Sequence, residues 1–308
     1  MKIEFQNVST KFGDFEVFND LNFDINSNCI TAIVGKNGAG KTTLIKGLST
    51  LLVFDEGQIN FFDKNITKDN YSFFRGQISI SLGDSKNLYL NLTVIENIKY
   101  FLSIHKNDYN SKKELIDYYL SIFNLNSYKN KIVSKLSKGM KQKLSIIISL
   151  VKDSKVLILD EPDIGLDIES MSTLKQILNN EKENKTIIIT SHNLNLVKDI
   201  SDRLILLDDG KVKYSGDINT FINSLNNNAT IEIYFEDILS DELKKSIREY
   251  SLDIEFKEKS FLVTVKKECI NDIFKTLLNF NNKIIDIGTR NSFENIIENV
   301  ILKREVSV

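Results

Sequence analysis

The segment from Gly35 to Thr43, GKNGAGKTT, has the residue types and spacing of a loop that binds phosphate groups. It follows the apolar run Ile30 to Val34 and precedes a helix-forming run, the strand–loop–helix context that the pattern G-x-x-x-x-G-K-[ST] requires. Glycines let backbone N–H groups converge on phosphate oxygens, and the N-terminus of the next helix attracts negative charge. Lys41 adds a positive charge, and Thr42 offers a hydroxyl to Mg²⁺. The predicted phosphate ligands are Gly35, Asn37, Gly38, Ala39, Gly40, Lys41, Thr42 and Thr43.

Two adjacent carboxylates, Asp160 and Glu161, follow a second apolar run, Val156 to Leu159. Such a run is typical of a strand covered on both faces in a parallel sheet, and α/β sheets bind ligands where their strands end. Asp160 is suited to hold Mg²⁺, and Glu161 can polarise the water that attacks a γ-phosphate. The alternative is that the pair only caps the next turn.

A histidine, His192, follows a third apolar run, Ile187 to Ile189, after Thr190 and Ser191. At the same sheet edge a neutral imidazole could hydrogen-bond the γ-phosphate or the attacking water. A structural histidine with satisfied hydrogen bonds is the alternative.

The composition excludes several classes of protein. The net charge of -2 and the mixture of acids and bases give no footprint for non-specific binding to nucleic acid or anionic lipid, so we expect neither partner. No apolar run approaches the roughly 20 residues of a membrane helix, and the N-terminus lacks the apolar core of a signal peptide, which predicts a cytoplasmic protein. Cys29 and Cys269 form no disulfide framework or metal-like spacing.

The pattern along the chain predicts an α/β fold with two domains. Alternating apolar residues within the first 25 positions indicate an antiparallel β layer, and the three apolar runs indicate a parallel-sheet core. The stretch between the first and second runs reads as mostly helical, with an inserted helical subdomain over about residues 86–153. Asp209-Gly210 predicts a tight hairpin that closes the first domain, residues 1–222.

The remaining chain predicts a small accessory domain over residues 231–308, after an asparagine-rich linker at residues 223–230. Its element order is βαββαβ, which favours a ferredoxin-like α+β fold. The expected strands and helices cover residues 231–235, 241–250, 252–256, 261–265, 270–280 and 284–287. A last helix would place apolar residues from Phe293 to Ile301 on one face, either against its own sheet or against a partner.

The run Leu136 to Gln142, LSKGMKQ, resembles the LSGGQ signature of ATP-binding cassettes, the nucleotide-binding domains of ABC transporters. Ser137 and Gly139 match the positions that contact a γ-phosphate in that family. Lys138 and Met140 replace a glycine and a glutamine, as in the LS-x-GM form of single-cassette exporters. A serine-capped helix is expected in any case, and its positive N-terminus is what would meet phosphate.

Other positions extend this resemblance over residues 1 to about 220. Phe12 falls where the family places an aromatic ring on adenine, although a phenylalanine in an early strand is more often part of the core. Ile164 to Asp167 resembles the loop that crosses to a partner cassette, and His192 matches the family's switch histidine. Asp84 stands where the family has the glutamine of its Q-loop, and its carboxylate could reach the Mg²⁺ shell.

The resemblance implies an ATPase that uses ATP and Mg²⁺. Two cassettes would stack head to tail as a homodimer, with each ATP between the Gly35–Thr43 loop of one copy and Ser137 of the other. The helical region near residues 84–105 would pass the motion to a separate membrane permease, which would hold the chain at the inner face of the membrane. The C-terminal run Ser292 to Ile297 resembles the appended domain of cassettes that serve exporters.

Two other functions remain open at this point. A non-transport cassette, such as a translation factor or a genome-maintenance ATPase, usually has two cassettes or long coiled coils, and this chain has one cassette and no sustained heptads. A regulatory module whose output is ATP binding would not need Glu161, which the chain retains.

Overall fold

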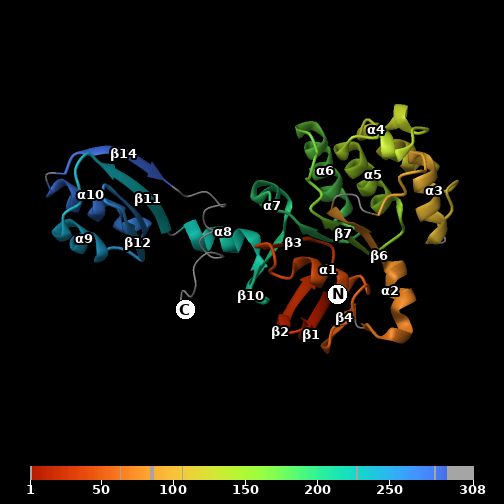
Figure 1. The fold of residues 1–308 in the computed structure, drawn as a ribbon, viewed down its shortest axis with the longest axis horizontal. Coiled ribbons are helices and arrows are strands. Elements are labelled where there is room, and N and C mark those ends of the chain that lie inside the picture. Colours follow the sequence, from red (N-terminus) through yellow and green to blue (C-terminus); the bar gives the residue numbers. More distant parts are fainter. Residues whose placement is uncertain are drawn as a thin grey trace. The chain divides into compact units, whose positions relative to one another are not determined.

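The computed structural model describes residues 2–62, 64–83, 87–105, 107–226, 228–280 and 282–289. The chain divides into two compact units, with the boundary between Asp217 and Ile218. Figure 1 shows the first unit in red to green and the second in blue-green to blue. Each unit is described by itself.

An antiparallel layer opens the first unit, as the alternating pattern predicts. It has four strands in the order β2-β1-β4-β5. The side chains of β1 alternate between buried and exposed positions, with Ile3, Phe5 and Val8 in the core. The strands are β1 (Lys2–Phe12), β2 (Phe15–Asn26), β4 (Glu56–Phe61) and β5 (Lys64–Asn65).

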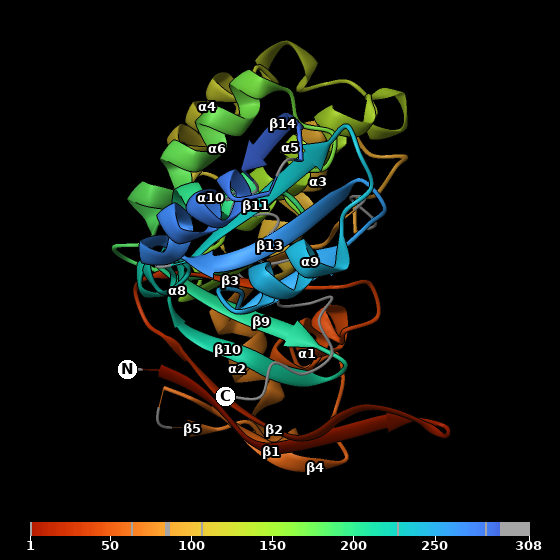
Figure 2. The same ribbon diagram turned by 90° about the vertical axis from the view of Figure 1, so that its left-hand side faces the viewer.

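A six-stranded sheet in the order β10-β9-β3-β8-β7-β6 forms the centre of the unit. Strands β6, β7, β8, β3 and β9 pair in parallel, and the hairpin β9–β10, visible in Figure 2, is antiparallel. Asp209 and Gly210 turn this predicted hairpin with φ angles of 45° and 69°. The strands are β3 (Ile30–Gly35), β6 (Ile78–Ser81), β7 (Val156–Asp160), β8 (Thr186–Thr190), β9 (Arg203–Asp208) and β10 (Lys211–Asp217).

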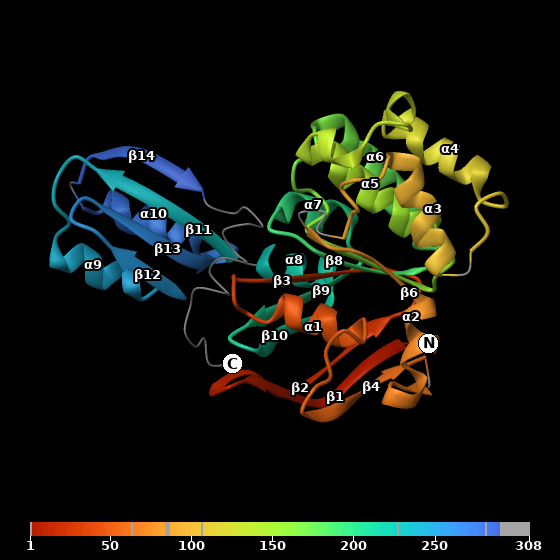
Figure 3. The same ribbon diagram turned by 45° about the vertical axis from the view of Figure 1, so that its right-hand side comes forward.

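Helix α1 (Lys41–Leu48) lies between the antiparallel layer and the central sheet, because its buried Leu44, Ile45 and Leu48 pack with apolar residues of both (Figure 3). The helical subdomain gathers on the other side of the sheet, around α3, α4 and α5. The remaining helices of the unit are α2 (Tyr71–Gln77), α3 (Val94–Ile104), α4 (Lys113–Ile122), α5 (Lys138–Val151), α6 (Ile168–Glu181) and α7 (Leu194–Ile200), with short 3-10 turns at Lys68–Asn70, Asn126–Tyr128 and Val133–Lys135.

The prediction of a mostly helical stretch between β3 and β7 is wrong between α1 and α3, where β4, β5 and β6 lie. Strand β6 escapes a local reading because two of its four residues are serines. Both serines are buried and bond helix α5: Ser79 Oγ donates to the Ser149 carbonyl at 2.7 Å, and Ser81 Oγ lies 2.8 Å from Ser145 Oγ. Their partners come from tertiary structure, which a local pattern does not contain.

The second unit has the predicted βαββαβ order, and its four strands pair antiparallel in the order β12-β13-β11-β14. Helices α9 and α10 bury Leu243, Ile247 and Ile273 in one apolar cluster with residues of the sheet. Strands β11 and β13 lie side by side in Figure 2. The elements are α8 (Ile218–Asn226), β11 (Asn228–Phe235), α9 (Asp241–Arg248), β12 (Asp253–Phe256), β13 (Ser260–Lys266), a 3-10 turn (Lys267–Cys269), α10 (Ile270–Leu278) and β14 (Ile284–Thr289).

The linker predicted at residues 223–230 is not an irregular segment, since α8 ends at Asn226 and β11 begins at Asn228. Asparagine has a low helix propensity, but Ile218 and Phe221 lie at helical spacing and are buried, so packing overrides the local preference. The boundary between the two units therefore lies before residue 222 in the sequence. The helix predicted from Phe293 to Ile301 lies outside the described residues.

Candidate functional site

The phosphate loop connects buried strand β3 to helix α1, and its backbone can be made only with glycine at key positions. Gly40 caps α1 with φ of 101°, a conformation that side chains disfavour. A Cβ atom there would also lie 2.4 Å from the ring of Phe18. Gly40 therefore brings the start of α1, and its unpaired N–H groups, into the loop as a phosphate site requires.

Lys41 is buried within this loop. Its ammonium donates to the carbonyl oxygens of Gly35 at 2.6 Å and Lys36 at 3.0 Å. Burial lowers the pKa of Lys41, while the nearby charges of Glu161 and Asp160 raise it. The Lys41 ammonium therefore lies against the backbone that would surround a phosphate group.

The two predicted carboxylates lie at the end of β7, beside the end of β8, where Asp160 pairs with Thr190. Glu161 adopts φ of 48°, which is uncommon for a residue with a side chain. Its N–H donates to the Thr190 carbonyl at 3.0 Å, and its own carbonyl accepts from Gln142 Nε2 at 3.4 Å. The turn at Glu161 is therefore held from both sides.

His192 lies next to Glu161, with 3.1 Å between His192 Nε2 and Glu161 Oε1. The loop that carries the imidazole is fixed by Ser191, whose hydroxyl donates to Asp163 at 2.8 Å and accepts from the N–H of Asn193. Glu161 and His192, predicted separately from two apolar runs, are thus brought into contact.

A pocket of about 290 Å³ joins the phosphate loop to the carboxylates and to an aromatic wall. Phe12 is 53% exposed, so its ring is not part of the core. The pocket's lining residues are Phe12, Phe15, Val17, Asn37, Gly38, Gly40, Lys41, Thr42, Thr43, Asp160 and Glu161. This arrangement offers a flat ring at one end and phosphate-binding groups at the other, as a nucleotide needs.

Sequence reasoning missed Phe15 and Thr190. Phe15 pairs with Phe12 across the β1–β2 hairpin and is 64% exposed, although its place in an alternating pattern favoured burial. An aromatic residue on each side of a short turn was the available signal. The sequence contained no signal for Thr190, because its contacts depend on the pairing of β7 with β8.

The described residues fit a Mg²⁺ site only in part. They contain no group of three or more His, Cys, Asp or Glu that could hold a metal without other ligands. Thr42 and Asp160 nevertheless line the same pocket, and Mg²⁺ commonly takes one or two protein ligands together with substrate phosphates. Asp84 lies outside the described residues.

The signature segment begins helix α5, where the Ser137 hydroxyl accepts from the N–H of Met140 at 3.2 Å. Gly139 packs against Gly165, and a Cβ atom on Gly139 would lie 2.3 Å from the Gly165 carbonyl oxygen. Lys143 bonds Asp167 at 3.2 Å, and the hydrogen bonds from Ser170 are the main reason that the pKa of Asp167 falls to about 2. Neither Ser137 nor Gly139 lines the pocket at Lys41.

Comparison of the chain with known proteins identifies its family. The family model described as "ABC transporter" matches residues 18–163. The chain is 36% identical over 214 residues to ABC transporter A family member 11 of Dictyostelium discoideum, covering 68% of this chain but only 25% of that protein. It is 31% identical over 206 residues to the ABC transporter ATP-binding protein NatA of Bacillus subtilis (strain 168), covering 67% of this chain and 83% of NatA.

The chain is also similar to a solved structure of the ATP binding subunit of an ABC transporter, with 25% sequence identity and a TM-score of 0.68. The match covers 73% of this chain and 94% of the chain in that structure. In the described part of the chain no helix is both long and apolar enough to cross a bilayer. The phosphate loop, the carboxylate pair and the signature helix, together with these matches, show that the chain belongs to the ATP-binding cassette family of ABC transporters, whose cassette domain is an ATPase.

Proposed function

We propose that the chain is the ATP-hydrolysing motor of a membrane exporter and works as a homodimer on the inner face of the membrane. The observation that carries the hydrolytic part is the contact of His192 with Glu161 beside the buried ammonium of Lys41. These groups line or adjoin one pocket and match the needs of phosphoryl transfer, which relies on positioning and charge neutralisation.

In this proposal each group has one task. Lys41 and the backbone N–H groups of the loop hold the β- and γ-phosphates, and Phe12 stacks on the base. Glu161 accepts a hydrogen bond from the attacking water, and His192 orients that carboxylate or the γ-phosphate. Thr42 and Asp160 would hold Mg²⁺, which would supply positive charge to the phosphate oxygens.

A second copy of the chain would complete the site. Ser137 and Gly139 lie at the positive N-terminus of α5 but outside the pocket at Lys41. In a head-to-tail dimer this helix end would meet the γ-phosphate held by the partner. The close fit of Gly139 on Gly165 would then link each signature helix to the loop that faces the other copy.

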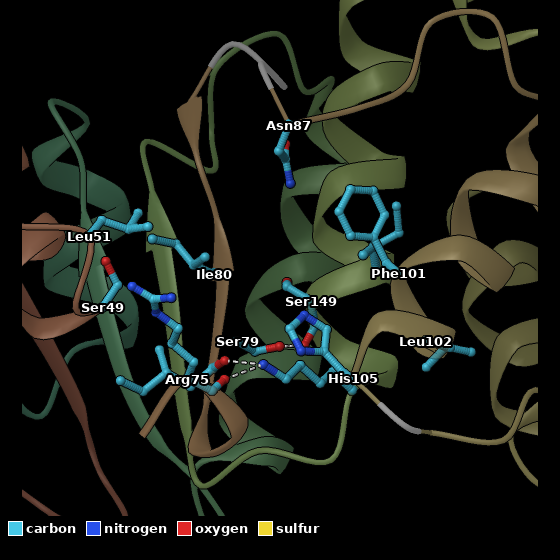
Figure 4. A pocket seen from close by; sticks show the side chains of 13 residues that line it. Ser49, Leu51, Arg75, Ser79, Ile80, Asn87, Phe101, Leu102, His105 and Ser149 are labelled. Carbon is cyan, nitrogen blue, oxygen red and sulfur yellow. Dashed lines mark hydrogen bonds between the residues drawn. The ribbon is translucent and has the colours of Figure 1, made fainter. Parts of the chain in front are cut away.

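The permease would dock at a separate groove of about 240 Å³, shown in Figure 4. Phe101, Leu102 and His105 line one side, and Leu51, Arg75 and Ile80 line the opposite side. Lys152 also lines the groove and donates to the Arg75 carbonyl at 2.8 Å. Among the described residues that line this groove, Arg75 and Lys152 are cationic, several are apolar and none is acidic. A short permease segment with an apolar face and a carboxylate would complement it.

Phosphate release by the purified chain tests whether it hydrolyses ATP. The coupling to a permease is tested with a membrane protein encoded beside this gene. We expect basal ATP hydrolysis by the chain and a higher rate when both proteins are combined in proteoliposomes. Export predicts ATP-dependent uptake of cargo into inside-out vesicles. Absence of phosphate release in both preparations would overturn the motor proposal, and uptake only into right-side-out vesicles would overturn export.

A further inference from the structure

One buried threonine contacts both acidic residues of the nucleotide site, the carboxylate of Asp160 and the backbone N–H of Glu161. Thr190 is the last residue of β8, and its side chain is inaccessible to solvent. Its hydroxyl donates to Asp160 Oδ1 at 2.5 Å. The same oxygen accepts from the N–H of Glu161 at 3.1 Å. The hydroxyl thus forms a continuous chain from the backbone of one carboxylate residue to the side chain of the other.

We infer that Thr190 is a positioning residue that fixes Asp160, the proposed Mg²⁺ ligand, and Glu161, the proposed water-polarising residue, relative to each other. This inference rests on the proposed roles of Asp160 and Glu161. A hydroxyl that accepts from an N–H donates more strongly, so the two hydrogen bonds reinforce each other in a buried setting. The short bond fixes which Asp160 oxygen is left for the metal.

The bond to Glu161 supports an unfavourable backbone conformation. A positive φ angle is strained for a residue with a side chain, so the surrounding structure must hold Glu161 in this conformation. Thr190 binds the Glu161 N–H through both its hydroxyl and its carbonyl oxygen. Without the hydroxyl, the Glu161 N–H would keep only the Thr190 carbonyl oxygen as an acceptor.

Threonine suits this position better than other hydroxyl residues. Its branched Cβ atom restricts rotation about χ1, which keeps the hydroxyl aimed between the strands. Strand β8 is fully buried, so an isosteric valine would keep the packing and remove only the hydroxyl. Serine would keep the hydroxyl with more rotational freedom.

The test compares Thr190→Val, Thr190→Ser and a control at the other end of the same strand. Thr186 is also buried in β8, but its hydroxyl accepts from the Asn28 N–H, away from the pocket. Thr186→Val therefore removes one buried hydroxyl from the same strand without touching either carboxylate. For each protein, kcat, the KM for ATP, the Mg²⁺ concentration at half-maximal rate and the melting temperature are measured.

We expect Thr190→Val to lower kcat by about 10- to 100-fold, since small displacements of catalytic groups have effects of this size. The Mg²⁺ requirement should rise, while the KM for ATP and the melting temperature should stay near those of Thr186→Val. Thr190→Ser should recover most of kcat. If Thr190→Val does not fold, Thr190→Cys, which keeps only a weak donor, takes its place with the same expectation.

A folded Thr190→Val protein with the parent kcat and Mg²⁺ requirement would overturn the inference, as would equal losses in Thr190→Val and Thr186→Val. A parent chain that hydrolyses no ATP, alone or with its permease, would instead refute the proposed function. The two failures are therefore distinguishable.

Discussion

The central six-stranded sheet of the first unit and the four-stranded sheet of the second place their strand ends differently. In the first unit β3, β7 and β8 are parallel, so Gly35, Asp160 and Thr190 all end strands at one edge. In the second unit neighbouring strands are antiparallel, and their carboxyl ends alternate between opposite edges. Parallel pairing gathers several strand-end loops around one ligand, whereas antiparallel pairing divides them.

The largest effect is expected from removing the central charge at the parallel edge. Lys41→Ala should weaken ATP binding and lower turnover by about 10²-fold or more, because a preorganised charge at the transferred group is lost. Fluorescent-nucleotide titration and phosphate release measure both effects. Lys275→Ala, which alters an exposed lysine of the second unit, is the matched control. Unchanged binding and turnover in Lys41→Ala would refute the phosphate-loop assignment.

A smaller effect is expected at the aromatic end of the pocket. Phe12→Ala should weaken ATP binding by about 1–3 kcal/mol if the ring stacks on the base. Its melting temperature should change little, because the side chain is half exposed. Titration with ATP and with inorganic triphosphate separates the base from the phosphates, and only ATP should lose affinity. A large fall in melting temperature with parent-like affinity would show instead that Phe12 is structural.

Lys152 is another buried lysine of the first unit, and it lies away from the parallel edge. Burial lowers its pKa from 10.5 to about 8. Between these values the unfolded chain binds a proton that the folded chain releases, so stability should rise with pH in this window. Urea unfolding from pH 7 to 10 should show this rise relative to Lys152→Met. A difference in stability between the parent and Lys152→Met that does not change with pH would contradict the lowered pKa of a buried Lys152.

The smallest effect is expected from deleting the second unit. A chain that ends at Asp217 retains every residue of the pocket, so its affinity for ATP should stay within about twofold of the parent, as for changes remote from a site. Circular dichroism establishes whether the truncated chain folds. A folded truncation that no longer binds ATP would show that the second unit contributes to the site.

The sequence was most informative where local pattern and tertiary role coincide. The three continuous apolar runs predicted β3, β7 and β8, and therefore the edge at which Lys41, Asp160 and His192 would meet. The elements that were missed depend on distant partners. The serines of β6 are buried because α5 accepts or shares their hydrogen bonds. Thr190 reaches the Asp160 carboxylate and the Glu161 N–H only through the register of β7 with β8.

In the second unit, local pattern alone was enough to predict the order of the elements. Its strand and helix order followed from alternation and helical spacing, because its core is formed by regularly spaced apolar residues such as Ile231, Ile233 and Val263. The end of the first unit did not follow, because an asparagine-rich stretch looks irregular until Ile218 and Phe221 are seen to be buried.

The central claim is that two copies of this chain enclose ATP and hydrolyse it through Glu161. Glu161→Gln keeps the shape of the side chain and removes the charge that polarises water, so ATP should bind and persist. Light scattering during size-exclusion chromatography then measures mass with and without ATP. We predict a shift toward about twice the monomer mass with ATP, as ligand-linked association requires, reversed on nucleotide removal and reduced by adding Ser137→Arg. A Glu161→Gln protein that binds ATP tightly yet remains monomeric at high concentration would contradict the homodimeric site.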